Sequence, residues 1–117
     1  MTERGMSEQA FLVLTALADE PKHGYGIVQA VETLSEGRVR LRVGTLYGVL
    51  DRLVADGWAE RDKEEIHQGR LRRYYRLTEA GGRALADQTR RLAANIDAAS
   101  TVLRARGWWS PQPEGGA

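Results

Sequence analysis

Cysteine is absent from the sequence, and this excludes disulfide bonds, cysteine-based zinc sites and thiol chemistry. Histidine is scarce: His23 and His67 are far apart in the chain and make no metal site by themselves. No apolar run approaches the ~20 residues that a membrane-spanning helix needs. The N-terminal residues lack the basic start and apolar core of a signal peptide, so we expect a cytoplasmic protein. Nucleophile elbows, phosphate loops and metal-ligand spacings are also missing, so we expect neither an enzyme nor a cofactor.

The formal net charge of +1 conceals an uneven distribution of charge. Residues 38–76 hold ten basic and six acidic residues, whereas the rest of the 117-residue chain holds seven basic and ten acidic ones. A positive middle third fits either an ordinary solvated surface or a patch that binds nucleic acid. The chain has the length of one small domain, which a dimer interface would help to stabilise.

Two short amphipathic helices are predicted in the first third of the chain. Ser7 is a suitable N-terminal cap for the first helix, whose apolar residues recur three and four positions apart until Pro21 ends it. The segment His23–Gly26 opens the second helix, and Gly37 is expected to close it. We expect the side chain of Tyr25 to lie in the core, and His23 to satisfy the turn before the helix.

A third helix is predicted between Thr45, its expected cap, and Gly57, its expected stop. The preceding residues 38–43 alternate basic and apolar side chains, as a short strand or an extended linker does. The apolar face of this helix comprises Leu46, Val49, Leu50, Leu53 and Val54. The opposite face comprises Thr45, Tyr47, Gly48, Asp51, Arg52 and Ala55. These short, polar or aromatic groups would let the helix approach another surface closely.

A β-hairpin is predicted after the third helix. Its strands are residues 58–62 and 72–77, joined by a polar loop over residues 63–71 that is longer than a tight turn. Because successive strand residues point to opposite faces, one of Tyr74 and Tyr75 should lie in the core and the other outside it.

A long final helix is predicted from Thr78, its cap, to about Arg106. Its apolar stripe is narrow and heptad-like, which suits a partner helix and predicts a dimerisation surface. The stripe comprises Leu85, Leu92, Ile96, Ala99 and Leu103. Trp108 and Trp109 then need apolar surroundings, either against a partner subunit or lining an effector pocket. We expect three segments: a DNA-binding domain (1–77), a dimerisation helix (78–107) and a Trp-Trp segment with a disordered tail (108–117).

Three short helices followed by a basic hairpin predict a mainly α (α+β) fold, the winged helix-turn-helix. In this fold the third helix enters the major groove of DNA, while the hairpin reaches the backbone or the minor groove. Arginines supply phosphate contacts, and polar groups of the third helix can touch bases. The candidate DNA-binding residues are Arg40, Arg42, Thr45, Tyr47, Arg52, Arg70, Arg72, Arg73 and Arg76.

Three separated motifs are similar to those of the PadR family of transcription regulators. They are His23-Gly24-Tyr25-Gly26-Ile27, then Gly44-Thr45-Leu46-Tyr47 with Leu50 to Leu53 and Gly57, then Arg73-Tyr74-Tyr75-Arg76-Leu77-Thr78-Glu79-Ala80-Gly81. The resemblance covers about residues 7–106 and is to the smaller subfamily with a single C-terminal helix. It implies a homodimeric repressor that binds a palindromic operator and is released by a small-molecule effector, with Tyr47 on DNA. Gly48 stands where the family often has proline, and Asp51 brings negative charge to the recognition helix.

Two alternatives stay open at this point. Winged helices also bind proteins through the same face, so a protein-interaction module without sequence-specific DNA binding is one of them. Another winged-helix regulator family, such as the MarR-like proteins, is the second. Those typically enclose the winged helix between dimerisation helices at both ends, whereas this chain begins almost directly with its first helix.

Overall fold

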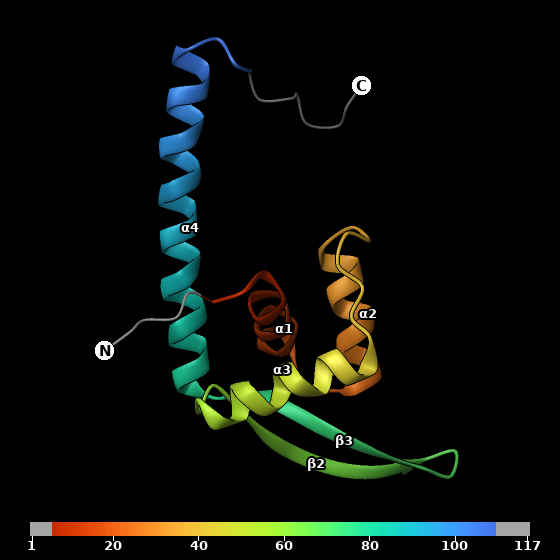
Figure 1. Cartoon of the computed structure of the whole chain (residues 1–117). Coiled ribbons are helices and arrows are strands. Elements are labelled where there is room, and N and C mark those ends of the chain that lie inside the picture. The colour runs from red at the N-terminus through yellow and green to blue at the C-terminus, as the bar shows by residue number, and fades with distance from the viewer. Residues whose placement is uncertain (1–5, 110–117) are drawn as a thin grey trace. The chain divides into compact units, whose positions relative to one another are not determined.

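A computed structural model describes residues 6–109 and gives a mainly α chain with one small antiparallel sheet (Figure 1). The elements are α1 (Glu8–Asp19), β1 (Lys22–His23), α2 (Gly24–Leu34), α3 (Val43–Ala55), β2 (Ala59–His67), β3 (Arg70–Leu77) and α4 (Glu79–Ala105). The strand order is β1-β3-β2. This element order is the winged helix-turn-helix that the sequence predicts, and the expected tail lies outside the described residues. The chain divides after Ala86 into two compact units.

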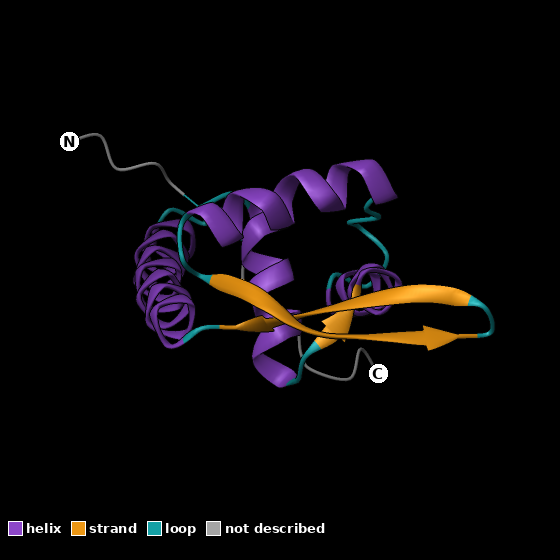
Figure 2. Ribbon diagram, turned by 90° about the horizontal axis from the view of Figure 1, so that it is seen from below, coloured by secondary structure: helices purple, strands orange, loops and turns teal. Residues whose placement is uncertain are grey.

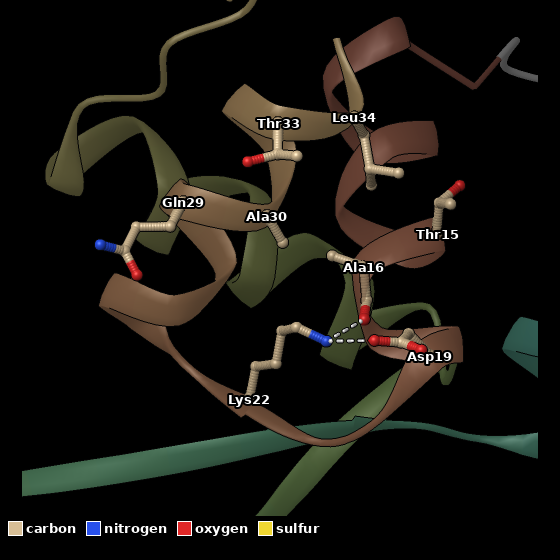
Figure 3. Close-up of a pocket in the computed structure, with 8 residues that line it drawn as sticks. All are labelled: Thr15, Ala16, Asp19, Lys22, Gln29, Ala30, Thr33 and Leu34. Carbon is tan, nitrogen blue, oxygen red and sulfur yellow. Dashed lines mark hydrogen bonds and ion pairs between the residues drawn. The ribbon is translucent and has the colours of Figure 1, made fainter. Parts of the chain in front are cut away.

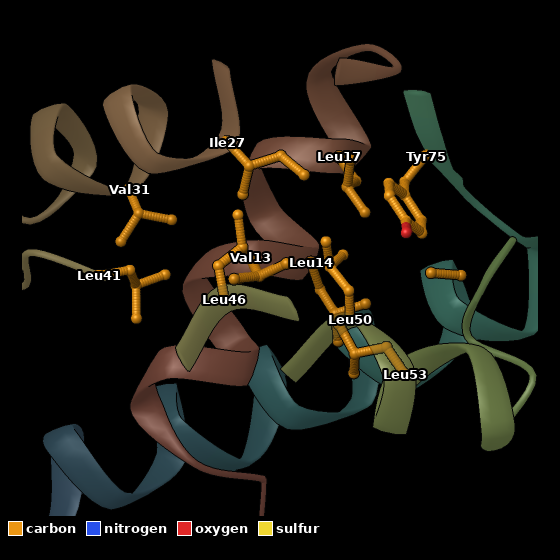
Figure 4. Packing of buried hydrophobic residues seen from close by; sticks show 11 residues of the cluster. Val13, Leu14, Leu17, Ile27, Val31, Leu41, Leu46, Leu50, Leu53 and Tyr75 are labelled. Atoms are coloured by element: carbon orange, nitrogen blue, oxygen red, sulfur yellow. The ribbon is translucent and has the colours of Figure 1, made fainter. Parts of the chain in front are cut away.

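The core of the first unit lies between the three short helices and the sheet (Figure 4). The N-terminal cap of α1 is Ser7, as predicted: its Oγ accepts the amide N–H of Ala10 at 3.0 Å. Fully buried side chains come from all three helices, since apolar residues recur at helical spacing in each. These side chains are Val13, Leu14, Ile27, Val31, Leu46, Leu50 and Leu53. Burying each such side chain stabilises the fold by roughly 1.5–3 kcal/mol.

The second helix ends as predicted, but one of its residues does not lie where we expected it. Glu36 and Gly37 follow the helix with positive φ of 54° and 83°, and the Gly37 amide donates to the Glu32 carbonyl at 2.8 Å. This is a left-handed C-terminal cap. The prediction for Tyr25 was wrong: its side chain is 65% exposed. It falls out of phase with Ile27 and Val31, which make the buried face of the helix.

The third helix begins two residues before the predicted cap. Its N-cap is Arg42, which makes no side-chain capping hydrogen bond, so Thr45 lies inside the first turn and the prediction of Thr45 as cap was wrong. The strand predicted as one possibility for residues 38–43 does not form: residues 39–42 have no regular secondary structure, Arg42 is extended, and Val43 already belongs to the helix. Gly57, at φ 78°, ends the segment as predicted.

The hairpin differs most from the prediction. Both strands continue through the segment predicted as a long loop, and only Gln68 and Gly69 separate them (Figure 2). These two residues have φ of 51° and 77°, as the central residues of a type I′ turn do. The strands were predicted too short because residues 60–65 are all charged and show no apolar alternation. They lack it because this part of the hairpin extends past the core. Of the two tyrosines, Tyr75 is buried at 3% exposure and Tyr74 is half-buried on the opposite face, as predicted.

The start of α4 is fixed against the turn that precedes β2. The Thr78 hydroxyl donates to the Gly57 carbonyl at 2.6 Å and accepts the Gly81 amide at 2.9 Å, so Thr78 caps the helix as predicted. Leu85 packs against the edge of the core. The helix ends at Ala105, and Gly107 follows with φ 77°.

Candidate nucleic-acid interface

The exposed face of α3 is the first component of the site. Leu46, Leu50 and Leu53 bury one side of this helix, and this burial turns the other side to solvent. The solvent side carries the residues predicted for it: Thr45, Tyr47, Gly48, Asp51, Arg52 and Ala55 are all exposed. The first turn holds no acidic residue and no side-chain cap. Its free amide N–H groups and the helix dipole therefore favour an anion at this end.

The hairpin of β2 and β3 is the second component, and ion pairs across its strands divide its arginines into two groups. Arg73 pairs with Glu64 at 3.2 Å, and Arg76 pairs with Glu60 at 2.8 Å and with Asp62 at 3.7 Å. These pairs connect facing strands and offset the positive charge of both guanidinium groups.

Arg70 and Arg72 form the other group. Neither makes an ion pair in the part of the chain that the structure describes. Both line the groove described below. Arg72 faces Glu65 across the strands, and each charge acts on the other. Arg70 faces His67 and leaves a positive charge near the tip of the hairpin.

The remaining predicted arginines also differ from one another. The Arg40 Nε lies 4.0 Å from a Glu32 carboxylate oxygen. Arg42 and Arg52 are exposed and have no acidic partner among residues 6–109.

A groove of about 680 Å³ lies where the starts of α2 and α3 meet the hairpin tip. It brings together segments that are far apart in the sequence. Its lining comprises His23, Gly24, Tyr25, Val43, Leu46, Tyr47, His67, Gln68 and Arg70 to Arg73. The groove therefore brings two tyrosines, from α2 and α3, together with three arginines of β3. Such a set suits a phosphate backbone, which accepts hydrogen bonds from both kinds of donor.

Sequence reasoning missed Tyr25 and His67 as members of this groove. Tyr25 is two residues before Ile27 and so off the buried face, a phase difference that could have predicted its exposure. The sequence pattern places His67 in a loop, whereas the structure has it at the end of β2, opposite Arg70. Only the correct hairpin register brings it to the groove.

A polar and aromatic cluster around Tyr74 joins the hairpin to α2. The Tyr74 hydroxyl donates to a Glu65 carboxylate oxygen at 2.6 Å, and the Lys63 ammonium lies 4.9 Å from the centre of the Tyr74 ring. The His23 ring meets that ring edge-on, with centres 5.3 Å apart. The hydrogen bond lowers the pKa of Glu65 and raises the pKa of Tyr74. The cluster thus holds the hairpin beside the first turn of α2.

His23 is also the N-cap of α2, as the sequence predicts. Its Nδ1 accepts the amide N–H of Gly26 at 3.2 Å, which requires that nitrogen to be unprotonated. Burial lowers the pKa of His23 below its ordinary value of 6.5; the charges of Arg72 and His67 act in the same direction, and Glu65 opposes them. The neutral imidazole is therefore the form that the fold favours.

A second hollow, of about 510 Å³, lies between α1 and α2 (Figure 3). Its walls are largely small or apolar, with Ala16, Ala30 and Leu34 among them. The Lys22 ammonium donates to the Ala16 carbonyl at 2.9 Å and to Asp19 at 3.2 Å, so its charge is already offset. This hollow is therefore less suited to an anion than the groove beside α3.

The second unit holds most of the predicted dimerisation stripe. Leu92 and Ile96 are 36% and 65% exposed, Ala99 is exposed, and Leu103 is half-buried. Most of the stripe residues in this unit are therefore only partly buried by the chain itself. Leu85, the first member of the stripe, belongs to the first unit and packs partly against its core.

The helix terminus fixes the backbone of Trp108. Its amide donates to the Leu103 carbonyl at 2.8 Å across the Gly107 turn. The Trp108 and Trp109 side chains are 75% and 41% exposed. Two large apolar groups at the end of this stripe add to the surface that a partner could cover.

Neither a membrane-spanning helix nor a metal site is present within residues 6–109. No helix there is both long and apolar enough to cross a membrane. No group of three or more histidines and carboxylates is arranged to hold a metal ion in the same range.

Comparison with known proteins assigns the family. A model of the PadR-like family of transcriptional regulators matches residues 13–87. The chain belongs to this family. The matched residues run from the middle of α1 through β3 into the first turns of α4, and the match ends where the second unit begins.

A relative agrees with this assignment, and solved structures share the fold. A transcriptional regulator of Mycobacterium tuberculosis is 40% identical over 80 residues, which cover 68% of this chain and 71% of that protein. A PadR family transcription regulator from Clostridium difficile has a TM-score of 0.70 at 20% identity and covers 83% of this chain and 99% of its own. Bacillus subtilis PadR in complex with operator DNA has a TM-score of 0.61 at 20% identity, covering 71% of this chain and 47% of its own. The two structures share the winged-helix fold with this PadR-family chain.

Proposed function

We propose that this PadR-family chain binds double-stranded DNA, with α3 in the major groove and the hairpin beside the backbone. One observation carries the proposal: the exposed start of α3 and the arginines of the hairpin tip border a single groove. The alternative is a module that binds protein through the same face. Exposed guanidinium groups beside a helix N-terminus favour DNA over that alternative, because both attract phosphate.

The predicted DNA-binding residues take different roles in this proposal. Thr45, Tyr47 and Arg52 occupy the exposed face of α3, where a helix in the major groove meets base edges and phosphates. Arg42 and Arg70 are exposed cations without acidic partners among residues 6–109 and contact phosphates directly.

The other four arginines differ in how strongly they contact phosphates. Arg72 contacts phosphates from the groove wall. Arg40, Arg73 and Arg76 lie beside carboxylates and contribute less, since a phosphate has to compete with those partners.

The proposed assembly is a homodimer. The stripe of Leu92, Ile96, Ala99 and Leu103 is covered by a second copy, and Leu85 extends it next to the core. A two-fold dimer presents two copies of α3, so it matches a palindromic operator with half-sites about one DNA turn (~34 Å) apart.

The regulatory part of the proposal follows the family resemblance. The chain acts in the cytoplasm as a repressor, and a small-molecule effector releases it from the operator. Trp108 and Trp109 line the effector pocket or close the dimer interface. An effector can weaken DNA binding only if it prefers one packing of the dimer over another.

Selection of genomic DNA fragments by the purified chain tests DNA binding, and sequencing identifies the operator. The selected site then serves for titrations at several salt concentrations. We expect Arg70→Ala to weaken binding and to reduce the salt slope by about one, because one phosphate contact is lost.

Arg83→Ala is the matched control for this titration. It removes the same charge from α4, outside the groove, where Arg83 pairs with Glu79. Binding and salt slope should stay close to those of the unaltered chain. Fragments recovered without any shared sequence, or equal slopes for both variants, would argue for the protein-interaction module.

A further inference from the structure

The first residue of α2 has no side chain at the point where Tyr47 of α3 meets it. A Cβ atom at Gly24 would lie 2.7 Å from the Tyr47 hydroxyl oxygen and 3.3 Å from the ring carbon that bears it. Both distances are shorter than an ordinary contact of 3.4 Å or more. Any larger residue at this position would therefore have to displace the end of the Tyr47 ring.

The backbone does not explain the glycine at this position. Gly24 is not among the residues with positive φ, so an L-amino acid could adopt its conformation. Glycine in a helix is also less favourable than alanine by about 1 kcal/mol. The close approach of Tyr47 is thus the feature of the structure that requires glycine here.

The neighbouring glycines lack this constraint. A Cβ atom at Gly26, in the same turn of α2, would meet the His23 ring at an ordinary 3.6 Å. At Gly44 and Gly48, on either side of Tyr47 in α3, it would meet nothing within 4 Å. The restriction therefore belongs to the contact between Gly24 and Tyr47.

This contact leaves Tyr47 half-covered. Gly24 is buried beneath the phenol, whereas 38% of Tyr47 remains exposed, and Tyr47 lines the same groove as Arg70 and Arg72. With the backbone of α2 behind it, the ring has fewer directions available than a free side chain at the start of a helix. A side chain that is already held in its bound direction loses less conformational entropy on binding.

We infer that Gly24 is a positioning residue for Tyr47, and that it sets the direction in which the phenol hydroxyl meets DNA. This inference rests on the proposed DNA binding and deepens it. Gly24 makes no DNA contact in this scheme. It acts by lacking a side chain, so that the Tyr47 ring can lie on the backbone of α2.

The first experiment measures ring position without DNA. The protein is labelled with 3-fluorotyrosine, and the Tyr47 resonance is assigned by its loss in Tyr47→Phe. Gly24→Ala should shift that resonance, whereas Gly26→Ala should leave it in place. An unmoved Tyr47 resonance in Gly24→Ala would overturn the inference whatever happens to DNA binding.

The second experiment is a double-mutant cycle on the selected operator. Gly24→Ala should raise Kd by about tenfold, the loss expected when one hydrogen bond to a charged group is misdirected. In the Tyr47→Ala background the same change should raise Kd by less than about twofold, because no ring remains to be displaced. Gly26→Ala is the matched control, with Kd again within about twofold of the unaltered chain.

The outcomes separate the inference from the proposed function. A Gly24→Ala effect that persists in the Tyr47→Ala background would mean that Gly24 acts through the fold, and the inference fails. The thermal unfolding midpoint of Gly24→Ala should stay within a few degrees of the unaltered chain, since only the far end of a side chain has to move. If the unaltered chain selects no operator, the proposed function fails, while the fluorine shift still tests the contact.

Discussion

His23 shows how one side chain can connect two parts of a small domain. Its Nδ1 caps α2 and its ring meets Tyr74 on the hairpin, so it joins the first turn of one element to the sheet. The sequence predicts that His23 satisfies the turn before α2, and in the structure it does so as the N-cap. The contact with Tyr74 depends on the pairing of β1 with β3, which no local pattern predicts.

The cap makes stability depend on pH in a definite direction. The pKa of His23 is lower in the folded chain than its ordinary value of 6.5, so the unfolded chain binds more protons between the two values. The stabilisation is fully present above pH 6.5 and is lost as the pH falls through the folded-state pKa. Protonation would also turn Nδ1 into a donor that faces the Gly26 amide.

Urea unfolding at a series of pH values between about 5 and 8 measures this dependence. His23→Asn is the control, since an Asn side-chain oxygen can keep the cap without titrating. We expect the midpoint of the unaltered chain to fall at acidic pH by more than that of His23→Asn. Parallel pH profiles for the two chains would show that His23 does not contribute.

Among the elements, the start of α4 depends on a very close backbone contact. A Cβ atom at Gly81 would lie 2.0 Å from the Trp58 carbonyl oxygen, whereas one at Gly82 would meet only Leu77, at 3.6 Å. A backbone carbonyl that also accepts the Thr78 amide cannot move aside cheaply. Of these two adjacent glycines, only Gly82 leaves room for a side chain.

We expect Gly81→Ala to lower the free energy of unfolding by about 3 kcal/mol, as overpacking against backbone does. Gly82→Ala should raise it by up to about 1 kcal/mol, because alanine favours the helix. Chemical denaturation of both variants measures the difference. Equal stabilities would mean that the α4 start can shift away from β2 without cost.

The hairpin shows why an element can be recognised while its length is misjudged. Its core end carries Ala59, Tyr75 and Leu77, whose alternation predicts strands. Beyond the core, cross-strand pairs such as Glu64 with Arg73 replace apolar alternation. Opposite charges at facing positions would have indicated the full strand length, but they can be paired only when the register is known. The register follows from the Gln68–Gly69 turn.

At the scale of the whole molecule, the second unit offers an apolar stripe that its own residues leave largely open. Changing Leu92 and Ile96 to Asp should raise the dimer dissociation constant by at least about 100-fold, since each unpaired carboxylate buried in an interface costs several kcal/mol. Sedimentation measures the change in mass. Operator binding should weaken together with dimerisation.

Changing Ala94 and Ala98 to Asp gives a control with the same spacing and charge. These exposed alanines lie on the opposite side of α4 from the stripe. The control should remain dimeric and bind the operator. A dimer that survives the Leu92 and Ile96 changes would require a different interface.

Local patterns predict the helices, their caps at Ser7 and Thr78, and the fold class, because caps and apolar periodicity act between neighbouring residues. The PadR family is indicated by three separated motifs and their order along the chain. Three features follow only from the tertiary structure: which arginines form ion pairs, the exposure of Tyr25, and the close contact of Tyr47 with Gly24. Those features depend on distances between elements that are remote in the chain. Such distances are set by strand register and helix packing, which local patterns do not encode.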